Sequence, residues 1–213
     1  MTLHFSVMEI RIDMQPINDE QKKTLSKLDD CICECFYYIS IYSDIFGKDT
    51  LAKKLDDFDG TLHYIMFNLV PEKIIMGICK ILDPPKSAGI SNLSLEAVIN
   101  DFKECIPEDF FNELFEELKT MQFKATKLKD IRNKILSHND KGLHLKTNII
   151  EGTNIKEIEA TLDVISIWMT KFQKKVIDTE TLYREGLYKF DAKWFEKMLD
   201  WGLEGKANFD RLN

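Results

Sequence analysis

The chain has 213 residues, of which 44% are hydrophobic and 31% are charged, so it is long enough to bury one sizeable core. No apolar run reaches the roughly 18 residues that a membrane-spanning helix needs, and residues 1–14 carry charges where a signal peptide would be apolar. The five cysteines, an odd number, argue against a secreted disulfide framework and favour reduced thiols. We therefore expect a cytoplasmic globular protein that has no contact with a membrane.

Helical spacing of the apolar residues runs along most of the chain. Gly47 should end the first helix, Pro71 should kink or restart the second, and Asn154 is a good N-terminal cap. Strand signals are confined to the short stretches 8–14 and 147–150. The sequence therefore predicts an all-α bundle of five to seven helices. The main predicted helices span about 19–46, 61–82, a short segment from 94, 108–137, 154–175 and 189–203.

Neither repeats nor low-complexity segments divide the chain. We expect three parts, of which the first is an N-terminal segment over residues 1–18. Residues 19–178 should form the helical bundle, because the apolar stripes that could share one core lie there. Residues 179–213 should form a C-terminal appendage, whose amphipathic helix includes Trp194 and Trp201.

The longest predicted helix carries an arginine inside its apolar stripe. Apolar residues keep a three-and-four spacing over 111–135, uninterrupted by glycine or proline. At about 100° per residue, Arg132 falls within the arc that includes Leu128 and Ile131, and His138 falls at the edge of that arc. An unpaired buried charge is strongly destabilising. Arg132 must therefore meet an acidic partner, line a cleft or face a second protein chain.

Positive charge gathers on the same helix. Residues 119–141 contain seven basic and two acidic side chains, a net charge of +5, so the rest of this −7 chain sums to −12. A basic strip beside Arg132 and His138 would attract phosphate groups, because binding releases counterions. The alternative is a solvated lysine face, which is what most charge runs are.

Three closely spaced cysteines do not predict a metal site. On a helix Cys31 and Cys35 share one face while Cys33 points nearly opposite, so the three thiols cannot converge on one ion. The rest of the sequence has no second pair of cysteines or histidines at zinc spacing. We therefore expect no metal and no cofactor, and small buried side chains at these positions.

The arginine and histidine of the long helix resemble the signature of the HEPN superfamily, an arginine followed after a short gap by a histidine. Five residues separate Arg132 from His138, and Asn133 is a polar residue often seen directly after the arginine of that motif. The residues around this pair, together with the blocks 81–84 and 92–96, are similar to the abortive-infection U-type branch of the superfamily. The resemblance covers most of the chain and implies an HEPN-like bundle with a long motif helix.

The activity that the resemblance implies is metal-independent cleavage of RNA. The ribose 2′-hydroxyl would attack the adjacent phosphorus and leave a 2′,3′-cyclic phosphate and a 5′-hydroxyl. His138 would transfer protons, and Arg132 would stabilise the charge that develops on the phosphorus oxygens. Supporting or RNA-binding roles would fall to Asn133, Lys134, Lys129, Asn139 and Asp140.

HEPN domains also pair so that the motifs of two chains meet in one cleft, which implies a homodimer through the motif helix. Such a protein would act as a toxic effector in prokaryotic antiviral defence or in a toxin–antitoxin system, with an antitoxin or another defence-system protein as a candidate partner. A catalytically silent HEPN module that binds protein or RNA is the alternative, and so is an unrelated helical protein in which Arg132 and His138 are structural. A nucleotidyltransferase-modified HEPN toxin is disfavoured, because Asp140 stands where its tyrosine would be.

Overall fold

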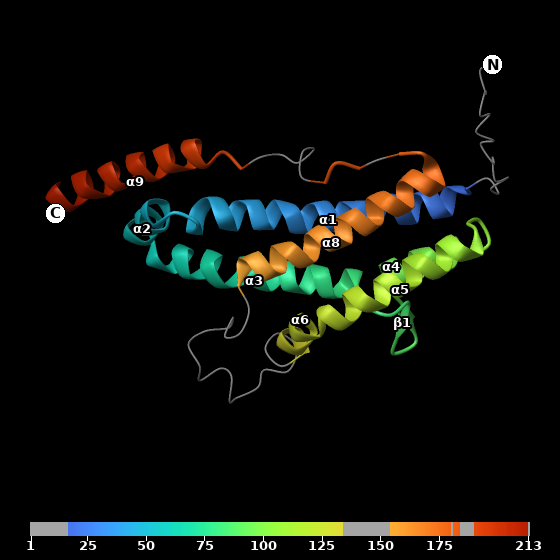
Figure 1. The fold of residues 1–213 in the computed structure, drawn as a ribbon. Helices are drawn as coiled ribbons and strands as arrows, with labels where there is room; N and C mark the ends of the chain where they lie inside the picture. The colour runs from blue at the N-terminus through green and yellow to red at the C-terminus, as the bar shows by residue number, and fades with distance from the viewer. Residues whose placement is uncertain (1–16, 134–153, 180, 184–189, 213) are drawn as a thin grey trace, which may run out of the picture.

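The computed structural model describes residues 17–133, 154–179, 181–183 and 190–212, which form an all-α bundle (Figure 1). The predicted fold class is confirmed, with eight helices in these described ranges. Two antiparallel strands of two residues each, β1 (Lys86–Ser87) and β2 (Ile90–Ser91), form a short hairpin between the third and fourth helices. The helices are α1 (Asp19–Phe46), α2 (Asp49–Phe58), α3 (Gly60–Ile81), α4 (Leu95–Asp101), α5 (Glu108–Lys124), α6 (Thr126–Ile131), α8 (Ile155–Ile177) and α9 (Ala192–Leu212).

Local capping signals set the ends of the helices as the sequence predicts. The Asn18 side chain accepts a hydrogen bond from the Gln21 backbone N–H, and the Gln21 side chain accepts one from the Asn18 N–H, which forms a capping box at the start of α1. Gly47 follows the last residue of α1. Asn154 caps α8 through the backbone N–H of Glu157. The two predicted strand segments, 8–14 and 147–150, lie outside the described residues.

Pro71 does not restart α3, which runs without a break from Gly60 to Ile81. Proline inside a helix removes one backbone hydrogen bond and costs about 3 kcal/mol or more. Pro71 is buried, as are Ile74 and Ile75 one turn later. Burial of this apolar surface therefore outweighs the lost hydrogen bond.

The predicted motif helix is divided at Ala125. Its first part is α5, Ala125 lies between the two helices with φ −81° and ψ 3°, and α6 continues to Ile131. The Thr126 hydroxyl donates to the Phe123 carbonyl oxygen at 2.6 Å and so satisfies one carbonyl at the break. Ala125 is fully buried, and the division lets the apolar sides of both helices reach the core. Predicted helical residues from 134 onward lie outside the described residues.

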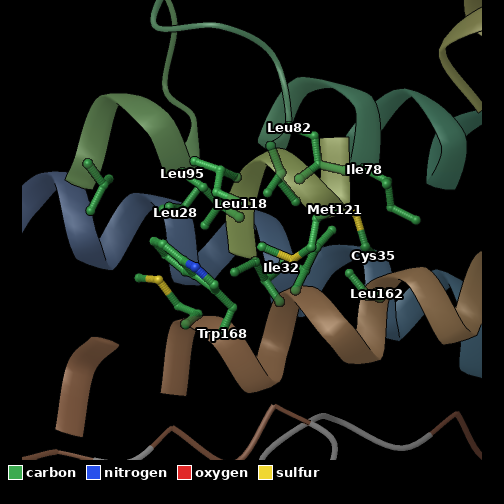
Figure 2. Close-up of a cluster of buried hydrophobic side chains, with 14 of the residues drawn as sticks. Leu28, Ile32, Cys35, Ile78, Leu82, Leu95, Leu118, Met121, Leu162 and Trp168 are labelled. Carbon is green, nitrogen blue, oxygen red and sulfur yellow. The ribbon is translucent and has the colours of Figure 1, made fainter. Parts of the chain in front are cut away.

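One continuous core joins α1, α3, α4, α5, α6 and α8. Side chains from these helices converge in Figure 2, where Cys35 of α1, Ile78 of α3 and Trp168 of α8 are among those labelled. The Trp168 indole N–H donates to the Leu114 carbonyl oxygen at 3.0 Å, which joins α8 to α5. Of the two parts of the divided motif helix, α6 contacts α3, while α5 packs against α4 and α8.

The C-terminal amphipathic helix predicted at 189–203 is present as α9, which packs against α2. A second small core joins α1, α2 and α9 through four buried residues, Ile45, Leu51, Leu55 and Leu199. The Lys54 ammonium pairs with Glu196 and Asp200 at 2.8 Å each, which ties the two helices at the surface. Among the described helices, none has an apolar stretch long enough to cross a bilayer.

Gly77 of α3 lies against Cys35 of α1, and it provides a test of the core. A Cβ atom at Gly77 would lie 2.5 Å from the Cys35 sulfur, too close unless the Cys35 side chain or the helices shift. We predict that Gly77→Ala lowers the free energy of unfolding by about 1–3 kcal/mol, the usual cost of overpacking.

The matched control is Gly205→Ala on α9, where an added Cβ would meet nothing within 4 Å. This change should raise stability by about 0.5–1 kcal/mol, because alanine loses less entropy than glycine in a helix. Urea denaturation measures both changes, and a Gly77→Ala protein as stable as Gly205→Ala would contradict the close approach.

Candidate functional site

The structure describes three of the seven sequence-predicted site residues: Arg132, Asn133 and Lys129. All three lie at or just after the end of α6, next to the C-terminal end of α3. The other four lie outside the described residues, and they are His138, Lys134, Asn139 and Asp140. The surroundings of Arg132 can therefore be described, while the role of His138 remains a prediction from the sequence.

Arg132 is held by an acidic residue of its own chain. Its Nη1 atom donates to both carboxylate oxygens of Asp83, at 2.8 and 2.9 Å. The two side chains are 18% and 23% exposed, so the pair is screened by solvent less than a surface ion pair. The Arg132 Nε atom donates to the Asn133 side-chain oxygen at 3.1 Å. Of the three environments open to Arg132 from the sequence, the structure shows the acidic partner.

Asp83 directly follows the last turn of α3, and the end of that helix is fixed by two side chains from the motif region. The Leu82 carbonyl oxygen accepts a hydrogen bond from the Lys129 ammonium and another from the Gln122 amide, each at 3.2 Å. Gln122 also donates to Glu96 at 3.0 Å. A cation at a helix C-terminus is favourable because unpaired carbonyl groups gather there. These bonds set the position of Asp83 relative to Arg132.

A buried thiol lies near this ion pair. Cys79 is fully buried on α3, and burial raises the pKa of its thiol to about 11, although the nearby Arg132 and Lys129 charges act in the opposite direction. The thiol is therefore protonated near neutral pH. A protonated and buried thiol is a poor nucleophile, so Cys79 serves as a packing residue.

The basic strip is partly paired within the described residues. The Lys127 ammonium lies 3.1 Å from a Glu157 oxygen, and the Lys119 ammonium lies 3.6 Å from a Glu116 oxygen. All four side chains are more than half exposed, and pairs of this kind contribute about 0–1 kcal/mol. Such weak pairs leave these lysines able to exchange their carboxylates for phosphate groups.

Of the three cysteines of α1, which were expected to be buried, only Cys35 is. Cys35 is buried, and burial raises the pKa of its thiol to about 12, while Cys31 and Cys33 are half-buried. Within the described ranges, no group of three His, Cys, Asp or Glu side chains is placed to hold a metal ion.

Sequence analysis did not identify Asp83, Gln122 and Glu96 as members of the site. Asp83 stands in one of the blocks that carried the HEPN resemblance, but no role was predicted for it. The available signal was the position of Arg132 in an apolar stripe, which required a counter-charge without identifying it. Only the packing of α6 against the end of α3 selects Asp83.

Comparison with known protein families identifies the family of this fold. A helical bundle that presents an arginine at the end of a long interrupted helix fits the HEPN class, and the model of the HEPN family AbiU2 matches residues 34–167. The chain therefore belongs to the AbiU2 family of HEPN proteins, which is related to abortive infection. The matched range includes Asp83, Arg132 and His138. Comparisons with curated proteins and with solved structures give no match.

The strength of the Arg132–Asp83 pair can be measured with a double-mutant cycle. Arg132→Ala and Asp83→Ala should each destabilise the fold, because each leaves a partly buried charge without its partner. The double variant should lose less than the sum of the two, with a coupling free energy of about 0.5–3 kcal/mol.

The control cycle uses Lys127 and Glu157, whose side chains are each 53% exposed. Their coupling should lie at or below about 1 kcal/mol. Urea denaturation gives all of the values, and equal coupling in the two cycles would contradict a special role for the partly buried pair.

Proposed function

We propose that this AbiU2-family protein is a metal-independent endoribonuclease that acts as a toxic effector in prokaryotic antiviral defence or in a toxin–antitoxin system. The observation that carries the proposal is the guanidinium of Arg132, which is held in a defined orientation inside the family-matched range. RNA is the proposed substrate. An antitoxin or another protein of the defence system is the proposed partner.

The proposed chemistry uses only the ribose hydroxyl and protein side chains. His138 would take the proton from the 2′-hydroxyl as its oxygen attacks phosphorus, and the P–O bond to the 5′-oxygen would break. A protonated histidine would return a proton to the leaving oxygen, so the products are a 2′,3′-cyclic phosphate and a 5′-hydroxyl. Arg132 would stabilise the negative charge of the transition state with the N–H groups not bound to Asp83 or Asn133.

Electrostatic attraction of RNA supports the same proposal. Lys129 places its ammonium group at the end of α3, close to the Arg132–Asp83 pair. The pair itself is neutral, so Lys129 supplies net positive charge at this point. Lys119 and Lys127 would add positive charge along α5 and α6 where a phosphate group displaces their exposed carboxylate partners, Glu116 and Glu157. Proposed supporting contacts from Asn133, Lys134, Asn139 and Asp140 would complete the RNA-binding surface.

A homodimer is part of the proposal, because one histidine does not easily perform both proton transfers. Arg132 has an intrachain partner, so the dimer is not needed to neutralise it. The pairing is proposed through the motif helix, and an apolar face of α3 would extend it, since Leu62, Ile65 and Leu69 share that face and are 37%, 42% and 54% exposed. Asp, Glu, Lys and Arg are absent between Gly60 and Pro71. A two-fold pairing of this segment would therefore set no like charges opposite each other.

The ion pair with Asp83 also favours a second candidate, a catalytically silent HEPN module that binds protein or RNA. In that case Arg132 would be a structural residue whose charge is already satisfied. The two candidates differ in turnover and not in fold, so they are separated by measuring cleavage.

We predict that purified protein cleaves total cellular RNA in the presence of EDTA and leaves cyclic phosphate ends. His138→Ala and Arg132→Ala should each reduce cleavage by at least about 100-fold, the usual lower range for loss of an acid–base group or of a charge-stabilising donor. Gel analysis and mass spectrometry of the product ends give both results.

Arg211→Ala on α9 is the matched loss of one positive charge outside the site and should keep the activity. Circular dichroism must show intact helices in each variant. Intact RNA in the wild-type reaction would reject the enzyme and leave the binding module as the function.

We also predict that the wild-type protein is a dimer at micromolar concentration and that Ile65→Glu makes it a monomer. The change would bury two like charges in the proposed α3 interface. Multi-angle light scattering measures the mass. Ile167→Glu on α8 introduces the same charge at an exposed apolar position and should leave the dimer intact. A wild-type monomer, or dissociation by both variants alike, would contradict the α3 interface.

A further inference from the structure

Asp83 holds one nitrogen of the Arg132 guanidinium, Nη1. Its two carboxylate oxygens accept from Nη1, while Nε is bound to the neighbouring Asn133 oxygen. A guanidinium is planar and rigid, so fixing two of its nitrogens also fixes the third. Among the described residues, Nη2 has no hydrogen-bond partner. The two N–H groups of Nη2 are therefore held in a set direction.

The chain around Asp83 is itself held on both sides. Before it, the Leu82 carbonyl oxygen accepts from Lys129 and Gln122. After it, the Asn92 side-chain amide donates to the Pro84 carbonyl oxygen at 2.8 Å. A side chain on such an anchored turn loses little freedom when it binds its partner, which is the condition for precise positioning of a functional group.

We propose that Asp83 is a positioning residue for the ribonuclease site, holding Arg132 so that its Nη2 N–H groups meet the scissile phosphate. This inference rests on the proposed function. Asp83 acts through Arg132, neither touching the RNA nor transferring a proton. Its role resembles that of carboxylates that orient a metal-binding histidine from behind, whose loss commonly costs about 10–100-fold in affinity or activity.

Simple electrostatics predicts the opposite sign for the effect of Asp83. A carboxylate beside a phosphate-binding arginine repels phosphate, so its removal should strengthen RNA binding and speed cleavage if charge alone mattered. Positioning predicts slower cleavage in spite of that gain in positive charge. The sign of the change in rate therefore separates the two effects.

Asp83→Asn and Asp130→Asn form the matched pair of variants. Each removes one negative charge, and Asp130 is an exposed residue of α6 just before the motif arginine. Among the hydrogen bonds and ion pairs of the described residues, none joins Asp130 to Arg132. On a short RNA of defined sequence, Asp83→Asn should lower kcat by about 10–100-fold with KM unchanged or lower, as for loss of an orienting carboxylate. Asp130→Asn should keep kcat within about two-fold and lower KM in low salt.

Two further measurements separate positioning from loss of the fold or from direct proton transfer. The residual activity of Asp83→Asn should keep the pH dependence of the wild type, because a positioning residue transfers no proton in the reaction. Free guanidinium ion should restore part of the activity of Arg132→Ala but not that of the Arg132→Ala/Asp83→Asn double variant, since Asp83 is the group that would hold it. Asp83→Glu, which keeps the carboxylate one methylene farther out, should give an intermediate kcat.

The outcomes are distinguishable. If Asp83→Asn cleaves as fast as Asp130→Asn or faster, the positioning role is overturned while the ribonuclease proposal stands. A changed acidic limb of the pH profile in Asp83→Asn would overturn it too, in favour of direct proton transfer. If the wild type does not cleave RNA at all, the proposed function fails and this inference fails with it. The positioning role is supported if Asp83→Asn cleaves more slowly with an unchanged pH profile. It is also supported if guanidinium ion rescues Arg132→Ala only when Asp83 is present.

Discussion

The charge of Arg132 determines how the end of α3 meets the end of α6. Its neighbours on the same helical face, Leu128 and Ile131, are buried, so the arginine enters a region where an unpaired charge is strongly unfavourable. Asp83 supplies the counter-charge, and it can do so only because α3 ends directly before it. The link from Leu82 to Lys129 strengthens the same junction. Neutralisation of one arginine therefore fixes the relative positions of two segments that are 49 residues apart.

The hydrophobic core holds the end of α3 in place at its contact with α6. Ile78, Ile81 and Leu82 have almost no exposed surface, so the last turn of α3 cannot move without opening the packed interior. The small residue Gly77 lets α1 approach that turn closely. Apolar packing thus places the end of α3, and the ion pair then orients the polar groups that project from it. The described part of the candidate site, which includes Arg132, Lys129 and Asp83, lies at helix ends and on one anchored turn, an arrangement that favours rigidity.

Sequence patterns predicted the parts of the fold that depend on local signals. Gly47 and Asn154 act through their own neighbours in the chain, so the helix ends they mark could be predicted. The break at Ala125 could not, because alanine favours helices and the apolar spacing continues across it. The need of Arg132 for a partner followed from its place in the stripe. The identity of that partner did not, because 36 acidic residues were available and only tertiary packing chooses among them.

An arginine that is paired with a carboxylate can still donate hydrogen bonds to a second group. A guanidinium has five N–H donors, and the bonds to Asp83 and Asn133 come only from Nη1 and Nε. The pairing also supplies a benefit that a free arginine lacks, because a long side chain in water must give up its rotamer freedom when it binds phosphate. Here that entropy is lost when the protein folds. Ordering the side chain therefore lowers the free energy of unfolding and does not add to the activation free energy of the reaction. In the proposed ribonuclease, an arginine that is already oriented would leave more of the RNA-binding energy for stabilising the transition state.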